Sequence, residues 1–123
     1  MPETEVIIYQ EKEDNVPLIE WLDSLSADAQ DKCYVKIELL KERGHKLRRP
    51  HSDILKDGIY ELRARKGNVH YRILYAFVGR NIVLLSHGCF KKDKVPSSEI
   101  KRAIRNRVNY LKEPEEHTYR GEV

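Results

Sequence analysis

The spacing of apolar residues predicts a short strand and then two helices in the first third of the chain. Residues 4–10 are rich in β-branched and aromatic side chains, which is typical of a strand. Pro17 suits the first turn of one helix, while Ser26 suits the N-cap of the next helix and Gly44 suits its end. Apolar residues recur at helical spacing in both helices, namely Leu18, Trp21, Leu22 and Leu25, then Ala29, Cys33, Ile37 and Leu40. We expect these helices to form a hairpin packed on one face of a sheet.

Three more strands and a final helix are predicted after a polar, basic connector at residues 45–58. The three strand-like runs are 59–65, 69–78 and 82–90. Turns at 66–68 and 79–81 contain glycine, which favours tight hairpins. Pro96 then opens a helix whose apolar stripe consists of Ile100, Ala103, Ile104, Val108 and Leu111. We expect residues 113–123, which are polar, to be frayed.

This order of elements predicts an α+β fold. An N-terminal strand and a helical hairpin pack on a small, mainly antiparallel four-stranded sheet, and a C-terminal helix follows. A chain of 123 residues supports one domain, which we place at residues 1–112, with a polar tail at 113–123. We find no apolar stretch of membrane-spanning length and no secretory signal at the acidic start. We therefore expect a cytoplasmic protein, without a membrane partner, whose Cys33 and Cys89 stay reduced.

The distribution of charge is more informative than the net charge of +3. Residues 1–40 carry three Lys or Arg and ten Asp or Glu, whereas residues 41–112 carry nineteen and six. A strongly basic central block indicates a polyanionic partner, and in the cytosol that partner is usually nucleic acid. The alternative is that these side chains are simply solvated.

Strand pairing predicts which of the cations share a face of the sheet. Two-residue loops in both turns would bring five of them together: Arg63, Arg65, His70, Arg72 and His87. Lys91, Lys92 and Lys94 follow in the adjoining loop. Burying so many cations without partners would be costly, so we expect an open groove that binds anions. The alternative is an exposed basic face on which Glu61 pairs with an arginine.

The opposite face would then hold the core of the domain. Its predicted members are Tyr60, Leu62, Ala64, Val69, Tyr71, Ile73, Tyr75, Phe77, Ile82, Leu84 and Phe90. The final helix adds a run of charged residues, Lys101, Arg102, Arg105 and Arg107, and such a run is usually a solvated face. The histidines and cysteines lack metal-ligand spacing, and no glycine-rich phosphate loop or nucleophile motif is present, so neither a metal nor a cofactor is predicted.

Three linked segments at matched spacing suggest a known family. They are LKDGIYELR at 55–63, YRILYAF at 71–77 and IVLLSHGCFKK at 82–92, followed by Pro96, Glu99, Ile100 and Ala103. Together with the order of elements, they resemble the HigB-like, phage-related toxins of the RelE/ParE superfamily. The resemblance extends over nearly the whole chain to about residue 112.

The resemblance implies the toxin of a type II toxin–antitoxin pair. Its family partner is a small helix-turn-helix antitoxin, and RelE- and HigB-type members cleave mRNA, typically on the translating ribosome, without a metal. It also implies an active-site role for Arg72 and matches family basic positions to Arg63, Arg65, Lys91 and Lys92. His87 is instead an inference from strand geometry.

From these residues we predict that the 2′-OH of RNA attacks its own phosphate while the protein aligns the attack and neutralises the developing charge. The predicted catalytic residues are Arg72, Arg63, His87 and Lys91. The predicted RNA-binding residues are Arg65, His70, Lys92 and Lys94. Two alternatives remain: a non-catalytic, ParE-like inhibitor of DNA gyrase, and an inactive nucleic-acid-binding homologue.

Overall fold

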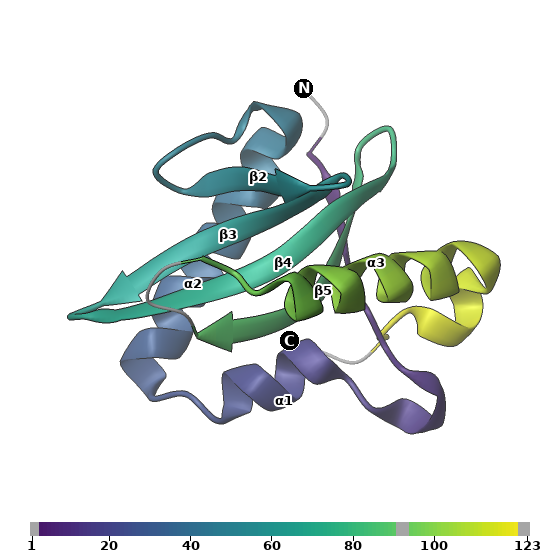
Figure 1. The fold of residues 1–123 in the computed structure, drawn as a ribbon, viewed down its shortest axis with the longest axis horizontal. Helices are drawn as coiled ribbons and strands as arrows, with labels where there is room; N and C mark the ends of the chain where they lie inside the picture. Colours follow the sequence, from purple (N-terminus) through teal and green to yellow (C-terminus); the bar gives the residue numbers. More distant parts are fainter. Residues whose placement is uncertain (1–2, 91–93, 121–123) are drawn as a thin grey trace.

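The computed structural model describes residues 3–90 and 94–120, in which it contains five strands and three α-helices (Figure 1). In chain order they are β1 (Glu5–Ile8), α1 (Pro17–Asp23), α2 (Ala27–Arg43), β2 (Ser52–Lys56), β3 (Ile59–Lys66), β4 (Val69–Gly79), β5 (Ile82–Phe90) and α3 (Ser97–Lys112). Short 3-10 turns lie at η1 (Lys12–Asp14), η2 (Gly44–Lys46) and η3 (Pro114–His117). Within the described part of the chain, no helix is long and apolar enough to cross a membrane.

The strands form one mixed sheet in the order β1-β5-β4-β3-β2. Only the β1–β5 pair is parallel among these neighbours, so the predicted α+β class with a mainly antiparallel sheet is confirmed. The sheet has one strand more than predicted, because β2 lies inside the segment that we assigned to a connector. β2 is a short edge strand whose Ile54 is 58% exposed, so it has no buried alternating face that the sequence pattern could reveal.

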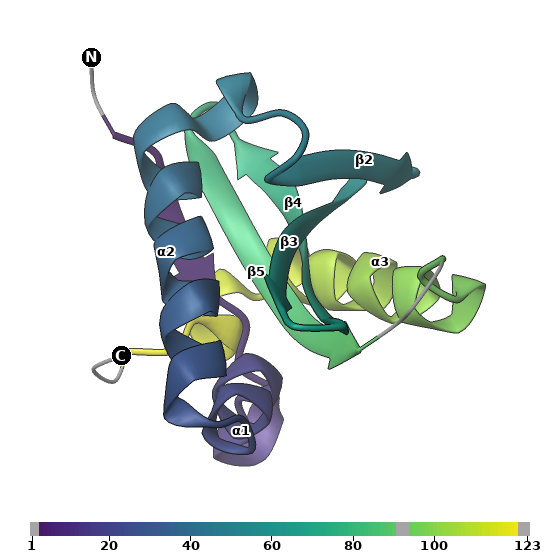
Figure 2. The ribbon, with the colours of Figure 1, turned by 90° about the vertical axis from the view of Figure 1, so that its left-hand side faces the viewer.

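The sheet lies between two layers of helices, as Figure 2 shows with α2 and α3 on opposite sides. The larger apolar cluster fills the space between the α1–α2 hairpin and one face, and it includes Leu18, Leu22, Cys33, Leu40, Leu62, Ile73, Tyr75 and Leu85. A second, smaller cluster joins α3 to the other face through Ile59, Leu74, Ala76, Cys89, Val95 and Ala103. Docking of α3 therefore covers part of the face that we expected to be open.

The β3–β4 hairpin has the predicted two-residue loop. Lys66 opposes Val69, which places Arg63 opposite Arg72 and Arg65 opposite His70. The predicted gathering of these four side chains on one face is therefore confirmed. Their position at the free end of the hairpin follows from the short turn at Gly67, whose positive φ of 59° suits glycine.

The β4–β5 pair keeps the predicted register along the first residues of β4 and departs from it further along that strand. Leu74 opposes His87 as expected, but the register shifts at the next position, where Tyr75 opposes Leu85. Leu84 consequently opposes Ala76, so its predicted place on the face of Tyr75 is wrong. The cause is a β-bulge at Ser86, because one extra residue reverses the alternation of side chains beyond it.

Other positions of the predicted core are confirmed only in part. Leu62, Ala64, Tyr71, Ile73 and Tyr75 are buried in the larger cluster, and Tyr60 and Phe77 pack against it. Four apolar residues placed on buried faces or stripes are instead exposed, namely Val69, Phe90, Val108 and Leu111. They lie at the free end of the β3–β4 hairpin, at the end of β5 and in the second half of α3, beyond the packed centre of the domain.

Residues 114–120 pack against the start of the chain, so the prediction that they fray is wrong. Tyr9 and Thr118 form an isolated antiparallel bridge, and the main-chain N–H of Tyr119 donates to the carbonyl of Ile8 at 2.9 Å. His117 is 5% exposed and stacks on Tyr9 with ring centroids 5.2 Å apart. One buried imidazole thus anchors a segment whose composition is otherwise that of a polar tail.

Candidate functional site

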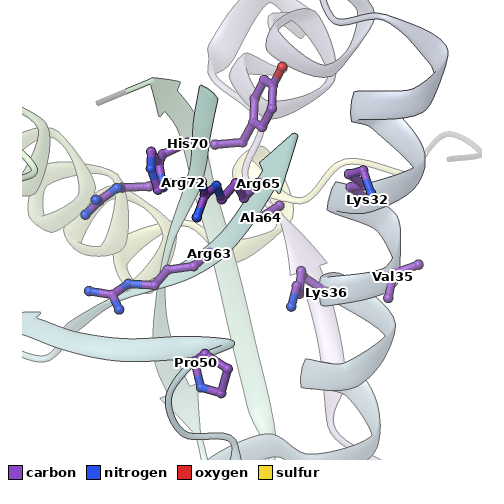
Figure 3. Close-up of a pocket in the computed structure, with 10 residues that line it drawn as sticks. Lys32, Val35, Lys36, Pro50, Arg63, Ala64, Arg65, His70 and Arg72 are labelled. Atoms are coloured by element: carbon purple, nitrogen blue, oxygen red, sulfur yellow. The ribbon is translucent and has the colours of Figure 1, made fainter. Parts of the chain in front are cut away.

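A groove of about 620 Å³ lies between α2 and the free end of the β3–β4 hairpin (Figure 3). β2 pairs with β3 only as far as Leu62, so the last residues of β3 extend beyond that edge strand. The groove is lined by Lys32, Val35, Lys36, Pro50, Arg63, Ala64, Arg65, His70, Tyr71 and Arg72. Six of these ten side chains are basic, which makes the groove a strongly cationic surface.

The basic side chains approach the groove from two directions. Figure 3 shows Lys32 and Lys36 on α2 and, across β3, the guanidinium groups of Arg63 and Arg72 pointing away from that helix. Strand alternation explains this arrangement, since Ala64 faces α2 while its neighbours face the opposite side. An extended anion that crosses the edge of β3 could therefore meet cations on both sides of the strand.

Glu61 connects the two arginines that we predicted to be catalytic. Its side chain is 1% exposed, and both of its carboxylate oxygens accept from Arg72 Nη1, at 3.1 and 2.9 Å. Arg63 Nε donates to Oε1 of the same carboxylate at 2.7 Å. A single buried carboxylate thus orients both guanidinium groups, so the pairing of Glu61 with an arginine, which was one part of the alternative interpretation, is observed.

The two arginines differ in how far they reach solvent. The side chain of Arg72 is 10% exposed, whereas that of Arg63 is 37% exposed. Arg72 Nε is buried and makes no hydrogen bond within the described residues. Arg72 thus lines the groove, but most of its side chain is buried and Glu61 largely compensates its charge.

Arg65 and His70 are opposed residues on the same face of the hairpin. Arg65 is exposed, and its Nε donates to the carbonyl of Gly67 at 2.7 Å, which keeps the guanidinium near the turn. His70 is half-buried and lines the groove. Arg63, Arg65 and His70 therefore form the accessible part of the hairpin face, and Arg72 lies behind them.

His87 shares this face of the sheet but lies outside the groove. It is 1% exposed beneath α3, so the prediction that it belongs to an open groove is wrong. Its Nε2 lies 3.2 Å from Glu99 Oε1, and its Nδ1 lies 2.8 Å from Ser86 Oγ, which itself accepts from Asn106 Nδ2. Burial lowers the pKa of His87 to about 4, with further lowering by Arg102 opposed by Glu99. The imidazole is thus neutral at pH 7, with Nε2–H donating to Glu99 and Nδ1 accepting from Ser86.

The structure describes only one of the three lysines beyond β5 to which we assigned a role. Lys91 and Lys92 lie outside the described residues. Lys94 is described and exposed, but it is not among the residues that line the groove. The roles assigned to these lysines stay predictions.

Sequence reasoning missed the basic residues that α2 contributes to the groove. Lys36 Nζ lies 2.7 Å from Nδ1 of His51, the residue that precedes β2. Burial lowers the pKa of Lys36, and burial together with the charges of Lys36 and Arg43 lowers the pKa of His51. The two residues belong to separate elements, so no local spacing indicated their contact. The i,i+4 pair Lys32 and Lys36 was the available signal, because both lie on one side of α2.

Within residues 3–90 and 94–120, no group of three or more His, Cys, Asp and Glu side chains is placed to hold a metal ion. The ionisable side chains that line the groove are those of lysine, arginine, histidine and tyrosine.

The architecture and the cationic hairpin together define a class of protein. A five-stranded mixed sheet with a helical hairpin on one face and a C-terminal helix on the other is broadly that of RelE-like toxins. A family model described as Phage derived protein Gp49-like (DUF891) matches residues 20–108, more than half of the chain. The chain belongs to this Gp49-like family, a toxin-like, phage-derived family in the RelE/HigB-type superfamily. No protein of curated function matched the sequence.

Proposed function

We propose that this protein is the toxin of a type II toxin–antitoxin pair and acts as an endoribonuclease on mRNA in the cytoplasm. The observation that supports this proposal is the hairpin face, where Arg63 and Arg65 stand beside His70 and a buried carboxylate holds Arg63 in place. Preorganised cations of this kind stabilise the charge that develops on phosphate during transfer. Membership in a toxin-like family supports the same conclusion.

The reaction that fits these residues uses the RNA itself as the nucleophile. The 2′-OH loses its proton and attacks the adjacent phosphorus, the bond from phosphorus to the 5′ oxygen breaks, and that oxygen takes up a proton. The products are a 2′,3′-cyclic phosphate and a 5′-OH. Deoxyribose has no 2′-OH, so DNA would be spared.

Each accessible residue has a proposed role in this reaction. Arg63 binds the phosphate that reacts, because it is the more exposed of the two arginines on Glu61 and a guanidinium fork matches two phosphate oxygens. Arg72 acts through Glu61 as a positioning residue. His70 is proposed for proton transfer, since imidazole is suited to this task near neutral pH. Arg65 and Lys36 would hold the flanking phosphates.

Two partners complete the proposal. The protein would bind mRNA on the translating ribosome, and a small helix-turn-helix antitoxin would cover the basic hairpin face. Both follow from the family resemblance and the excess of positive charge in the central block. Induction in cells that carry or lack a candidate antitoxin tests the second partner, since only an antitoxin restores growth.

A non-catalytic inhibitor is the second candidate, and a specific observation favours it. His87 is buried and neutral, and Arg72 is largely covered, so fewer of the predicted catalytic groups reach the groove. The same hairpin face could then bind a polyanion without cleaving it, or the protein could inhibit DNA gyrase as ParE-like toxins do. Intact mRNA together with DNA damage after induction would favour gyrase inhibition.

The decisive experiment is primer extension on cellular mRNA after induction, followed by cleavage with purified components. We expect new 5′ ends in mRNA, and in vitro cleavage of RNA that leaves 2′,3′-cyclic phosphate ends and disappears with 2′-O-methyl RNA. Reactions with and without ribosomes determine whether translation is required. Growth arrest with intact mRNA, and no cleavage under either condition, would overturn the proposal.

A further inference from the structure

A second groove, of about 440 Å³, lies where the C-terminal half of α3 meets both ends of the chain. Figure 1 shows this part of α3, with η3 and the η1 turn, on the side of the sheet away from the free end of the β3–β4 hairpin. Tyr9, Asn109, Lys112 and His117 line this groove. Seven of the ten residues that line it, these four among them, lie outside residues 20–108, so the family model matches this site only in part.

The cations of this groove come from one face of α3. Arg102, Arg105 and Lys112 line it, and their spacing with Asn109 places them along a single side of the helix. None of these three cations forms an ion pair or a hydrogen bond within the described residues. The positive charges of Arg102 and Arg105 act on neighbouring groups, since both lower the pKa of His87.

Two acidic residues also line the groove, but they do not neutralise it. Glu113 is already paired with Lys12 at 3.3 Å, which leaves Glu11 against the three unpaired cations of α3. The net charge of the lining residues is therefore positive. An anion that entered would meet guanidinium and ammonium groups without first displacing a resident carboxylate from them.

The wall of this groove is built from ordered polar groups. His117 is 5% exposed and its Nδ1 lies 2.8 Å from the carbonyl of Gln10. A carbonyl only accepts, so Nδ1 carries the proton, and no hydrogen bond of Nε2 is found within the described part of the chain. Asn109 Nδ2 donates to Tyr9 Oη at 3.2 Å, and the Tyr9 ring stacks on His117. These contacts fix an imidazole, an amide and a phenol beside the unpaired cations.

We propose that this groove is a second phosphate-binding site, and that its ligand is the phosphodiester backbone of RNA. Arginine forks and amide N–H groups suit phosphate oxygens, and consecutive cations along one helix face suit successive phosphates better than a single compact anion. The choice of RNA as the polyanion rests on the proposed function, whereas the binding of phosphate does not. An RNA that occupies both grooves would run from the free end of the β3–β4 hairpin to the opposite end of the domain, where the C-terminal half of α3 lies (Figure 1).

Binding is tested with 2′-O-methyl oligonucleotides, which keep their phosphates but lack the attacking 2′-OH. The variant is Arg105→Gln with Lys112→Gln, and the matched control is Lys101→Gln with Arg80→Gln, which removes two exposed cations that do not line this groove. We expect the groove variant to bind a 12-mer about tenfold more weakly and to lose roughly 1.4 units of salt slope, with trinucleotide binding unchanged. The control should bind the 12-mer within about twofold of the unmodified protein.

Nuclear magnetic resonance locates the ligand without depending on mutation. The 12-mer should shift the side-chain signals of Asn109 and His117, and inorganic phosphate should shift the same signals at higher concentration. Equal affinity of the groove variant and the control would overturn the site. Shifts with inorganic phosphate alone would overturn RNA as its ligand. If the unmodified protein binds the 12-mer at this groove but cleaves no RNA, the proposed nuclease is refuted and the second site is still supported.

Discussion

Glu61 and Arg72 form an ion pair that is almost entirely shielded from water: Arg72 Nη1 lies 2.9 Å from Glu61 Oε2, with the two side chains 10% and 1% exposed. The pair is formed on one face of the β3–β4 hairpin, two positions apart across the strands. Arg63 contacts the same carboxylate from the more open side. Glu61 therefore links the stability of the hairpin to the orientation of its accessible arginine.

Removing Glu61 should strongly destabilise the fold. Glu61→Ala leaves the buried charge of Arg72 without its partner, and breaking a buried pair typically costs about 3–5 kcal/mol. Urea unfolding followed by circular dichroism measures this loss. The control is Glu113→Gln, which removes an exposed pair with Lys12 and should cost at most about 1 kcal/mol. Equal stability of the two variants would contradict the importance of the buried pair.

Arg72→Ala should also lower stability, because Arg72 is largely buried and paired with Glu61. The substitution leaves Glu61 with Arg63 as its remaining cation and opens a space in the hairpin. Thermal unfolding of purified Arg72→Ala and Arg72→Lys measures the effect, and we expect the lysine variant to recover part of the loss. An unchanged melting temperature for the alanine variant would show that the pair contributes little.

Arg63→Gln should separate activity from stability. Arg63 is partly exposed and we propose that it binds the reacting phosphate, so its loss should slow RNA cleavage by roughly 10²–10³-fold with little change in unfolding. Single-turnover cleavage of a labelled RNA gives the rate. Arg80→Gln, an exposed residue of the β4–β5 turn, is the matched control. Similar rates for the two variants would refute the assigned role.

Stability should fall between about pH 6.5 and pH 4 because of His87. Its pKa is lowered to about 4 in the folded chain, so the unfolded chain binds a proton first as the pH falls. The stabilisation is thus fully present above pH 6.5, decreases through this window and levels off below pH 4. The size of the effect is about 3 kcal/mol.

Urea unfolding at several pH values tests this dependence against His87→Gln, which cannot titrate. The difference in stability between the two proteins should change with pH in the same window. A His87 ring that titrates near pH 6.5 by nuclear magnetic resonance would contradict the buried, neutral state. The experiment does not depend on RNA cleavage.

Gly88→Ala should disrupt the packing of α1 on β5. A Cβ at this position would lie 2.1 Å from the Trp21 ring, so the helix or the strand must move. Overpacking of this kind typically costs about 1–3 kcal/mol. Gly67→Asn is a suitable control, because a Cβ at Gly67 meets nothing within 4 Å and asparagine tolerates positive φ. Equal melting temperatures for the two variants would show that α1 adjusts freely.

The sequence by itself determined the main elements and which side chains of the basic hairpin share a face. Side chains alternate with period two, so either two-residue loop at 66–68 places Arg63 and Arg65 on the face of His70 and Arg72. The structure then selects the pairing of Arg63 with Arg72 and of Arg65 with His70. The linked motifs by themselves likewise indicate a toxin-like family. These inferences succeeded because they depend on residues close together in the chain or joined by a short turn.

Only the tertiary structure decided which of these groups are buried. The apolar stripe of α3 predicts a helix but not the sheet face on which it docks, and that docking covers His87 while leaving Arg63 accessible. The contact between Lys36 and His51 likewise joins two separate elements. The bulge at Ser86 and the edge strand β2 lie within hairpins, but the pattern of apolar residues does not reveal them. Periodicity is a local property of the chain, whereas burial is set by whichever element packs on top.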